Sequence, residues 1–231
     1  MRYFKKSLQY LISYPVYFFL YIISPFLRIR FGRIYANRVG HLCFNTDNYL
    51  SSIKNKKNVF TFFCYDEPIS NEYLFRLFNK NTNIFFSNKV RFLYYIFQNI
   101  NKNSKLLVSN QNELHPKISF ISSQERNLPP INNYDLLNEF LKKNNINDKF
   151  VCINNRDNQY LKEINSQDKN NHNFRNFKIS SFNKTIKYLV DQGFFVIRVG
   201  KISENPIQYE SKKVIDLTNK NYNEQLQILL F

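Results

Sequence analysis

The sequence predicts an α/β fold in which short apolar strands alternate with helices. Two strand candidates, 151–155 and 194–198, are apolar and lead into charged residues, and a helix-length segment separates them. Parallel strands need a crossover of that length, usually a helix. Near the front, a strand at 33–36 is followed by a glycine-containing turn and a helix at 42–53. That order is the opening unit of a Rossmann-like domain.

The same patterns predict how the chain is divided. A membrane-associated segment covers 1–30, and an amino-terminal Rossmann-like domain covers 31–110. The next stretch, 111–133, is polar and contains three prolines, which is typical of a linker. Residues 134–231 form a second domain of the same kind, which we expect to be incomplete.

The amino-terminal segment predicts a helix associated with a membrane. Residues 7–27 carry no charge, and their 21 residues are about the length that spans a bilayer core. Basic residues on both flanks suit anionic lipid headgroups and leave the orientation open. We expect a helix that lies in or dips into the inner leaflet, with a single span as the alternative. A cleaved signal peptide lacks its cleavage site, and an ordinary buried helix rarely has so long an uncharged run.

Further elements follow from apolar spacing. In the first domain we expect a turn at 37–41, a buried strand at 59–64 and helices at 71–79 and 89–100. His115, in the linker, is interpreted as a surface histidine.

In the second domain, we expect a helix at 134–144 and a strand at 213–217. The crossover helix can be capped by Ser180 or Ser181, and Gly193 fits its end. The sequence stops on an apolar run inside a helix at 222–231, so we expect a further portion of the second domain to follow.

Composition bounds the partners. With 231 residues, 43% of them hydrophobic, the chain can bury one good core or two small ones. The net charge of +16 is partly explained by the residues that AT-rich codons favour, and no nucleic-acid-binding motif accompanies it, so no nucleic acid is expected. Cys43, Cys64 and Cys152 are widely spaced, which predicts buried thiols in a reducing compartment.

Three arginines predict an anion site. Arg156 and Arg198 lie at the ends of the two apolar strands, and Arg175 lies in the polar segment between them. Ligands of open α/β sheets bind outside the carboxyl ends of strands, and a guanidinium matches the paired oxygens of a diphosphate. We therefore expect all three arginines to converge on one ligand. The alternatives are an ion pair between Arg156 and Asp157, and a solvated strand end at Arg198.

Four sequence blocks carry a resemblance to a known family. They are Arg-Asp-x-x-Tyr-Leu at 156–161, His-Asn-Phe-Arg-Asn at 172–176, Gly-Phe-Phe-Val-Ile-Arg-Val-Gly at 193–200 and Asn-Arg-Val-Gly-His-Leu at 37–42. Together they resemble a family of bacterial glycosyltransferases found in surface-polysaccharide gene clusters. The resemblance runs from residue 33 to the end, with a weak middle. It implies a GT-B pair of Rossmann-like domains whose second half is similar to the fucosyltransferase-like group, which needs no metal.

The resemblance and the arginines together assign roles on the donor side. Transfer would move a sugar from a nucleotide diphosphate, and arginines beside the leaving diphosphate would stabilise the charge that develops there. No cofactor and no metal are expected. The donor-binding candidates are Arg156, Arg175, Asn176, Arg198 and Gly200.

The remaining candidates are catalytic or lie on the acceptor side. His41 or His172 is the candidate general base, because histidine titrates near neutral pH. Asp157 is a candidate to orient an arginine or contact a sugar hydroxyl, with a structural ion pair as the alternative. The acceptor-side candidates are Gly40, Asn45 and Tyr160, of which the tyrosine has packing as its alternative role.

The expected partners are a nucleotide-sugar donor, a lipid-linked or oligosaccharide acceptor and an anionic membrane surface. These place the protein at the cytoplasmic face of the bacterial inner membrane. Two other classes of function stay open. One is an inactive fragment or a membrane-bound scaffold, and the other is an RNA-binding protein that uses Lys and Tyr surfaces.

Overall fold

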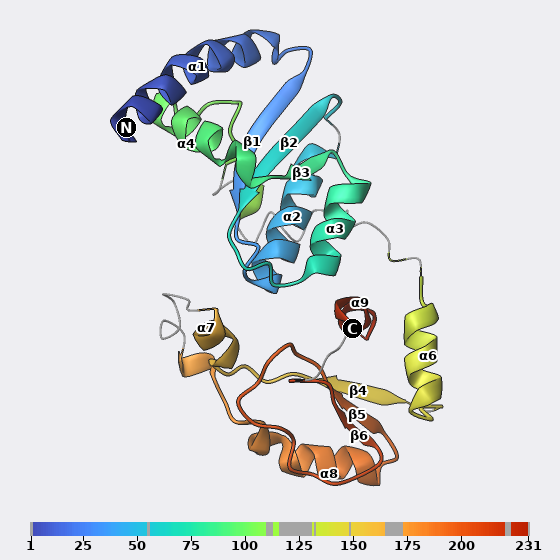
Figure 1. Ribbon diagram of the computed structural model, residues 1–231. Helices are drawn as coiled ribbons and strands as arrows, with labels where there is room; N and C mark the ends of the chain where they lie inside the picture. The colour runs from blue at the N-terminus through green and yellow to red at the C-terminus, as the bar shows by residue number, and fades with distance from the viewer. Residues whose placement is uncertain are drawn as a thin grey trace. The chain divides into compact units, whose positions relative to one another are not determined.

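The computed structural model describes residues 2–54, 56–109, 113–115, 131, 133–147, 149–164, 173–219 and 223–230, with the side chains of 2–10, 12 and 81 left out. The chain divides into two compact units, Met1–Pro130 and Ile131–Phe231. Each unit has its own three-stranded parallel sheet (Figure 1). The predicted α/β class is confirmed.

The sheet of the first unit consists of β1 (Arg28–Ile34), β2 (Val59–Tyr65) and β3 (Ile84–Phe86) in that order. A parallel bridge pairs Phe31 with Leu107 on the other edge of β1. The resulting order, β3, β2, β1 and the Leu107 segment, is that of the first half of a doubly wound sheet. Ligands of such sheets bind at the carboxyl ends beside the point where the order reverses, which here is the end of β1.

Helices cover both faces of this sheet (Figure 1). On one face, α1 (Arg2–Ile23) and α4 (Arg91–Ile100) build an aromatic core, in which the ring centroids of Tyr17 and Phe31 each lie 5.2 Å from that of Phe97. On the other lie α2 (Val39–Ile53) and α3 (Glu72–Asn81). There Tyr49 of α2 bonds Thr61 and packs against Phe63 of β2.

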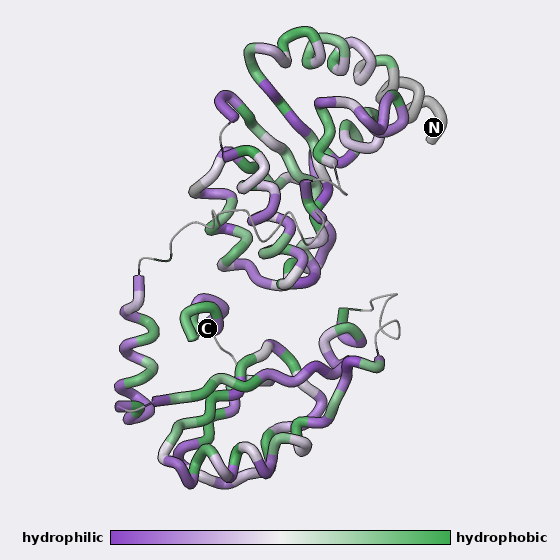
Figure 2. The backbone as a smooth tube through the Cα atoms, turned by 180° about the vertical axis from the view of Figure 1, so that it is seen from behind, coloured by the Kyte–Doolittle hydropathy of each residue, from purple (hydrophilic) through white to green (hydrophobic). Residues whose placement is uncertain are grey.

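Hydrophobic residues recur along the coloured part of α1 (Figure 2), yet only one side of this part of the helix is buried. The buried side includes Tyr17 and Leu20, which belong to the core of the first unit. The prediction from the long uncharged run that this is not a buried helix was therefore wrong for that side. No helix among the described residues is long and apolar enough to cross a membrane. The single-span alternative therefore finds no support.

Two further expectations for this unit need correction. Gly40 is the second residue of α2 and does not lie in a turn, because the helix begins at Val39. The first strand begins at Arg28, five residues before its predicted start at Arg33.

The second unit has a sheet of β4 (Phe150–Ile153), β5 (Phe195–Arg198) and β6 (Val214–Asp216). As predicted, β4 and β5 are adjacent and parallel, and α8 (Asn183–Asp191) connects them. Alternate strand residues face opposite sides: Val196 contacts Ile186 of α8, whereas Ile197 faces α6 (Asp135–Lys143) and α9 (Glu224–Leu229).

The ends of α8 were predicted in part. Gly193 has a φ of +89°, which suits the left-handed residue that ends a helix. The start differs from the expectation, because a 3-10 turn at Ile179–Phe182 precedes the helix and its cap residue, Phe182, makes no side-chain bond. Neither Ser180 nor Ser181 is the cap.

Candidate functional site

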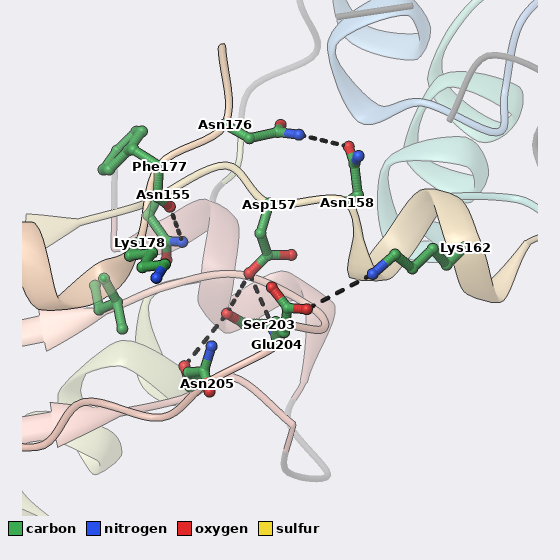
Figure 3. Close-up of a pocket in the computed structure, with 11 residues that line it drawn as sticks. Asn155, Asp157, Asn158, Lys162, Asn176, Phe177, Lys178, Ser203, Glu204 and Asn205 are labelled. Atoms are coloured by element: carbon green, nitrogen blue, oxygen red, sulfur yellow. Dashed lines mark hydrogen bonds and ion pairs between the residues drawn. The ribbon is translucent and has the colours of Figure 1, made fainter. Parts of the chain in front are cut away.

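A polar pocket of about 200 Å³ opens in the second unit at the carboxyl ends of β4 and β5 (Figure 3). This is the edge where parallel α/β sheets bind ligands. Segments after β4, before α8 and after β5 form its walls. Its described lining residues are Asn155, Asp157, Asn158, Lys162, Asn176, Phe177, Lys178, Ile179, Ser203, Glu204 and Asn205.

Asp157 joins two of these walls. Its Oδ2 accepts hydrogen bonds from the Ser203 hydroxyl at 2.6 Å and the Glu204 backbone N–H at 3.0 Å, and its Oδ1 accepts from the Gln159 N–H at 3.0 Å. Figure 3 shows the carboxylate directed at the Ser203–Glu204 turn. Burial favours the neutral acid, but the bonds from Ser203 and the two backbone groups outweigh it and lower the pKa of Asp157. The side chain is therefore a carboxylate at neutral pH.

Arg198 lies at the end of β5, as predicted, but its guanidinium is enclosed by protein. The side chain is 1% exposed. Its Nη1 donates to Asp216 Oδ2 at 3.1 Å and to the Asn205 carbonyl at 2.7 Å, while its Nη2 donates to Asn155 Oδ1 at 2.5 Å and to the Ser203 hydroxyl.

The expectation that Arg198 binds a donor diphosphate is thus corrected. A guanidinium that is 1% exposed and has four protein acceptors is not open to a ligand. Arg198 instead ties the end of β4, the end of β6 and the turn after β5 together beneath the pocket.

Amide side chains dominate the upper wall. The Asn176 amide donates to Asn158 Oδ1 at 2.7 Å, and the Asn158 amide donates to Asn173 Oδ1 at 2.5 Å. The Oδ1 atom of Asn176 is buried and has no hydrogen-bond partner. Amides supply both donors and acceptors, which suits a ligand rich in hydroxyl groups.

Two lysines supply the positive charge of this pocket. Lys162, on α7 (Gln159–Glu163), lies 3.6 Å from a carboxylate oxygen of Glu204, and Figure 3 shows it reaching across to that residue. Lys178 lines the opposite side and is exposed. A lysine is a compact point charge that binds phosphate oxygens readily.

The other predicted donor residues do not line this pocket. Arg156 is half-buried, and its carbonyl accepts from the Phe177 N–H at 3.0 Å. Arg175 is exposed and stacks 5.6 Å from the ring centroid of Phe174. Gly200 bonds Gln227 through its N–H at 2.8 Å. Of the donor-side candidates, only Asn176 is a lining residue, and the expected convergence of three arginines is not observed.

The two candidate bases lie far apart in the sequence. His172 lies outside the described residues. His41 lies in the first unit, where its ring centroid is 5.8 Å from those of Tyr35 and His115. Burial, assisted by the charge of Arg38 and by His115, lowers the pKa of His41, so the imidazole is neutral at pH 7.

The acceptor-side candidates have separate settings. Asn45 is fully buried, and its amide lies 3.4 Å from Nε2 of His115, the exposed histidine predicted from the linker. Gly40 is exposed on α2, in the same part of the first unit as His41. Tyr160 is half-buried on α7 of the second unit. None of the three lines the pocket.

Sequence reasoning missed the residues that build most of the pocket. Ser203, Glu204 and Asn205 follow the β5 strand that had been identified, so the rule that ligands bind at strand ends could have found them. Lys178 precedes the crossover helix and carried no comparable signal. Among the described residues, no cluster of three His, Cys, Asp or Glu side chains could hold a metal ion.

No protein-family model, no curated protein and no solved structure matches the chain.

Proposed function

We propose that the protein is a glycosyltransferase of the GT-B kind that uses a nucleotide-sugar donor and a lipid-linked or oligosaccharide acceptor. The observation that carries the proposal is the pocket at the carboxyl edge of the second parallel sheet, lined by four asparagines, two lysines and two carboxylates. Amides and carboxylates suit sugar and ribose hydroxyls, and lysines suit the diphosphate.

In the proposed reaction, the bond between the anomeric carbon and the diphosphate oxygen breaks, and its electron pair stays on the diphosphate. The acceptor hydroxyl oxygen forms the new bond to that carbon, and its proton passes to a base, for which His41 and His172 are the candidates. In this proposal Lys178, which lines the pocket, meets the charge that grows on the leaving group and stabilises the transition state more than the ground state.

Asp157 has a different task in this proposal. Its oxygens hold the Ser203–Glu204 turn, so it positions the pocket wall and does not transfer the proton. A depressed pKa agrees with that task, because a general base works best with a pKa near the operating pH.

The test compares Lys178→Gln with Lys184→Gln in the full chain. Lys184 is exposed on α8, which follows Lys178 in the chain, and it does not line the pocket, so it controls for net charge. Calorimetric titration with UDP- and GDP-sugars should show the affinity falling about tenfold for Lys178→Gln, which is about 1.4 kcal/mol, and staying unchanged in the control. Absence of binding to both nucleotide classes, or equal behaviour of the two variants, would overturn the assignment of the pocket.

A further inference from the structure

The helix α1 presents two opposite stripes of side chains. The inner stripe recurs every three or four residues and is buried against the rest of the first unit: it consists of Ser13, Tyr17 and Leu20, and the buried Ser24 continues it just after the helix. The outer side of the helix is apolar as well, but more than half of each of its large side chains is exposed: Leu11, Phe18, Phe19 and Ile22, with Phe26 continuing this outer stripe after the helix. An amphipathic helix would expose polar groups there. A large exposed apolar surface of this kind usually binds a membrane, another protein or an apolar ligand.

A basic pocket lies directly beside the end of this helix. It has a volume of about 500 Å³, which falls in the usual range for sites of small ligands, about 300–1,000 Å³. Ser24 and Pro25, just after α1, form part of its wall, and the first residues of β1 and β2 form another part. Phe26, 82% exposed, follows this wall in the chain and continues the outer stripe.

The charge of the pocket is one-sided. Among its described lining residues are four cations, Arg28, Arg30, Lys56 and Lys105, and a single carboxylate, Glu113. The Glu113 carboxylate forms an ion pair with Arg30, whose two terminal nitrogens lie 2.6 and 2.7 Å from the carboxylate oxygens. The exposed side chains of the other three cations therefore give the pocket a net positive charge.

The apolar stripe and the basic pocket adjoin. Lys105 places its Nζ 4.0 Å from the ring centroid of Tyr21, which is on α1. A soluble anion would use the cations alone and leave the stripe exposed to water, and an apolar protein partner would leave the cations unpaired. An anionic phospholipid satisfies both, because its phosphate meets the cations while its acyl region meets the stripe.

We propose that the outer stripe of α1 and the adjoining basic pocket dock the protein on a membrane surface, with the phosphate of an anionic phospholipid held by Arg28, Lys56 and Lys105. The helix then lies in the plane of the interface, with its inner stripe on the protein and its outer stripe in the lipid. This inference concerns the first unit and does not rest on the glycosyltransferase proposal.

The experiment measures sedimentation of the full chain with lipid vesicles. One set is pure phosphatidylcholine, and the other is an equal mixture of phosphatidylcholine and phosphatidylglycerol. The wild-type protein should partition to the mixed vesicles and little to the neutral ones. Replacing Arg28, Lys56 and Lys105 together by Gln should reduce partitioning to the mixed vesicles about a hundredfold, since each cation near an anionic surface contributes about a factor of five.

A matched control removes the same charge elsewhere. Lys142, Lys143 and Lys149 are exposed in the second unit, and their triple Gln variant should partition as the wild type does. A separate variant with Phe18→Ser, Ile22→Ser and Phe26→Ser should lose binding to mixed vesicles while it keeps the inner stripe. Thermal unfolding of each variant verifies that the first unit is folded, and Lys105→Arg should retain binding, because it keeps the charge.

Three outcomes would overturn the proposal. In the first, the pocket variant and the control variant partition equally. In the second, soluble glycerol phosphate binds the wild type in calorimetry while mixed vesicles do not, which would assign the pocket to a free phosphate. In the third, the protein self-associates without lipid and the outer-stripe variant abolishes this, which would assign the stripe to a second copy of the chain.

Discussion

Asp157 illustrates, at the scale of single residues, how a carboxylate at a strand end can be structural. Three hydrogen bonds converge on its two oxygens, and all three come from segments that border the pocket. These bonds favour the charged form more than burial disfavours it, so the pKa of Asp157 is lower in the folded chain than in the unfolded one. Folding is therefore linked to the ionisation of this residue.

The sign of that linkage gives a prediction. Because the folded pKa is depressed, the stabilisation from Asp157 is fully present above the unfolded value, about 3.9, and is lost as the pH falls through the folded value. We expect Asp157→Asn to unfold at a lower temperature than wild type at pH 7, with the difference shrinking below about pH 4. Thermal melts followed by circular dichroism from pH 7 to pH 3 measure it.

Asp191→Asn is the control for this series. Asp191 is exposed on α8 and forms an ion pair with Lys187 of its own helix, so its replacement should leave the acid-side loss of stability as in wild type. If Asp157→Asn followed the wild-type melting curve at every pH, the bonds from Ser203 and Glu204 would carry no stabilising role.

At the same scale, sequence reasoning located Arg198 correctly but could not see its partners. Arg198 and Asp216 are register partners on the parallel strands β5 and β6, which brings them side by side. The strand at 213–217 had been predicted, but its register against β5 depends on a loop of 15 residues, 199–213, that carries no helical pattern. Because this register could not be predicted, the sequence suggested that the Arg198 guanidinium was free to bind a ligand, whereas the structure buries it against Asp216.

Two glycines of the first unit, Gly32 and Gly40, have different surroundings. Substitutions at these positions can test the packing around β1 and the start of α2. A Cβ added at Gly32, in β1, would lie 2.3 Å from Cε1 of Phe63 and 3.1 Å from Cβ of Val108. The ring of Phe63 is fully buried and packs against Tyr49. A Cβ added at Gly40, in α2, would meet nothing within 4 Å.

We therefore expect opposite effects of the same substitution. Gly32→Ala should lower the free energy of unfolding by about 1–3 kcal/mol, because the core is overpacked. Gly40→Ala should raise it by about 0.4–1 kcal/mol, because alanine restricts the unfolded chain and favours the helix. Urea unfolding curves of the two variants and the wild type measure both changes.

The pair also tests the role assigned to Gly40. If a ligand backbone or sugar approaches α2 there, Gly40→Ala would stabilise the protein and impair transfer. Destabilisation by Gly40→Ala would contradict its placement within the helix.

Element lengths explain which parts of the fold could be predicted. The strand at 59–64 and the β4–α8–β5 crossover are long apolar or periodic runs, and the structure reproduces them. The strand β3 was missed because it has three residues and follows a polar stretch rich in asparagine. Its position is fixed by pairing with β2, which is a tertiary effect that local patterns do not record.

At the scale of the whole molecule, the two units have separate cores. The core of the first unit includes Tyr17, Phe31 and Phe97, and that of the second includes Ile186, Val196 and Ile197. Removing one partner of a buried ion pair leaves an unpaired charge and costs about 3–5 kcal/mol. We expect a loss of stability of this size in one unit to affect the sheet of that unit and to leave the other sheet unchanged.

Hydrogen exchange by mass spectrometry on the full chain can test this. Arg198→Ala should speed exchange of amides in β4, β5 and β6, because Asp216 and Asn155 lose their shared partner. Exchange in β1 and β2 should match the wild type. Arg175→Ala, an exposed arginine of the same unit, is the control and should change neither sheet. Equal acceleration in both sheets would show that the units unfold as one.

The enclosed guanidinium of Arg198 separates the frame of the pocket from its inner surface. One side chain fixes the spacing of three backbone segments, while Asn158 and Asn176 line the pocket and their amides bond to each other. The residues that line the pocket can therefore be substituted, and its ligand preference changed, while the three strands keep their positions. A change of specificity would therefore be engineered by replacing Asn158 and Asn176 while Arg198 is kept.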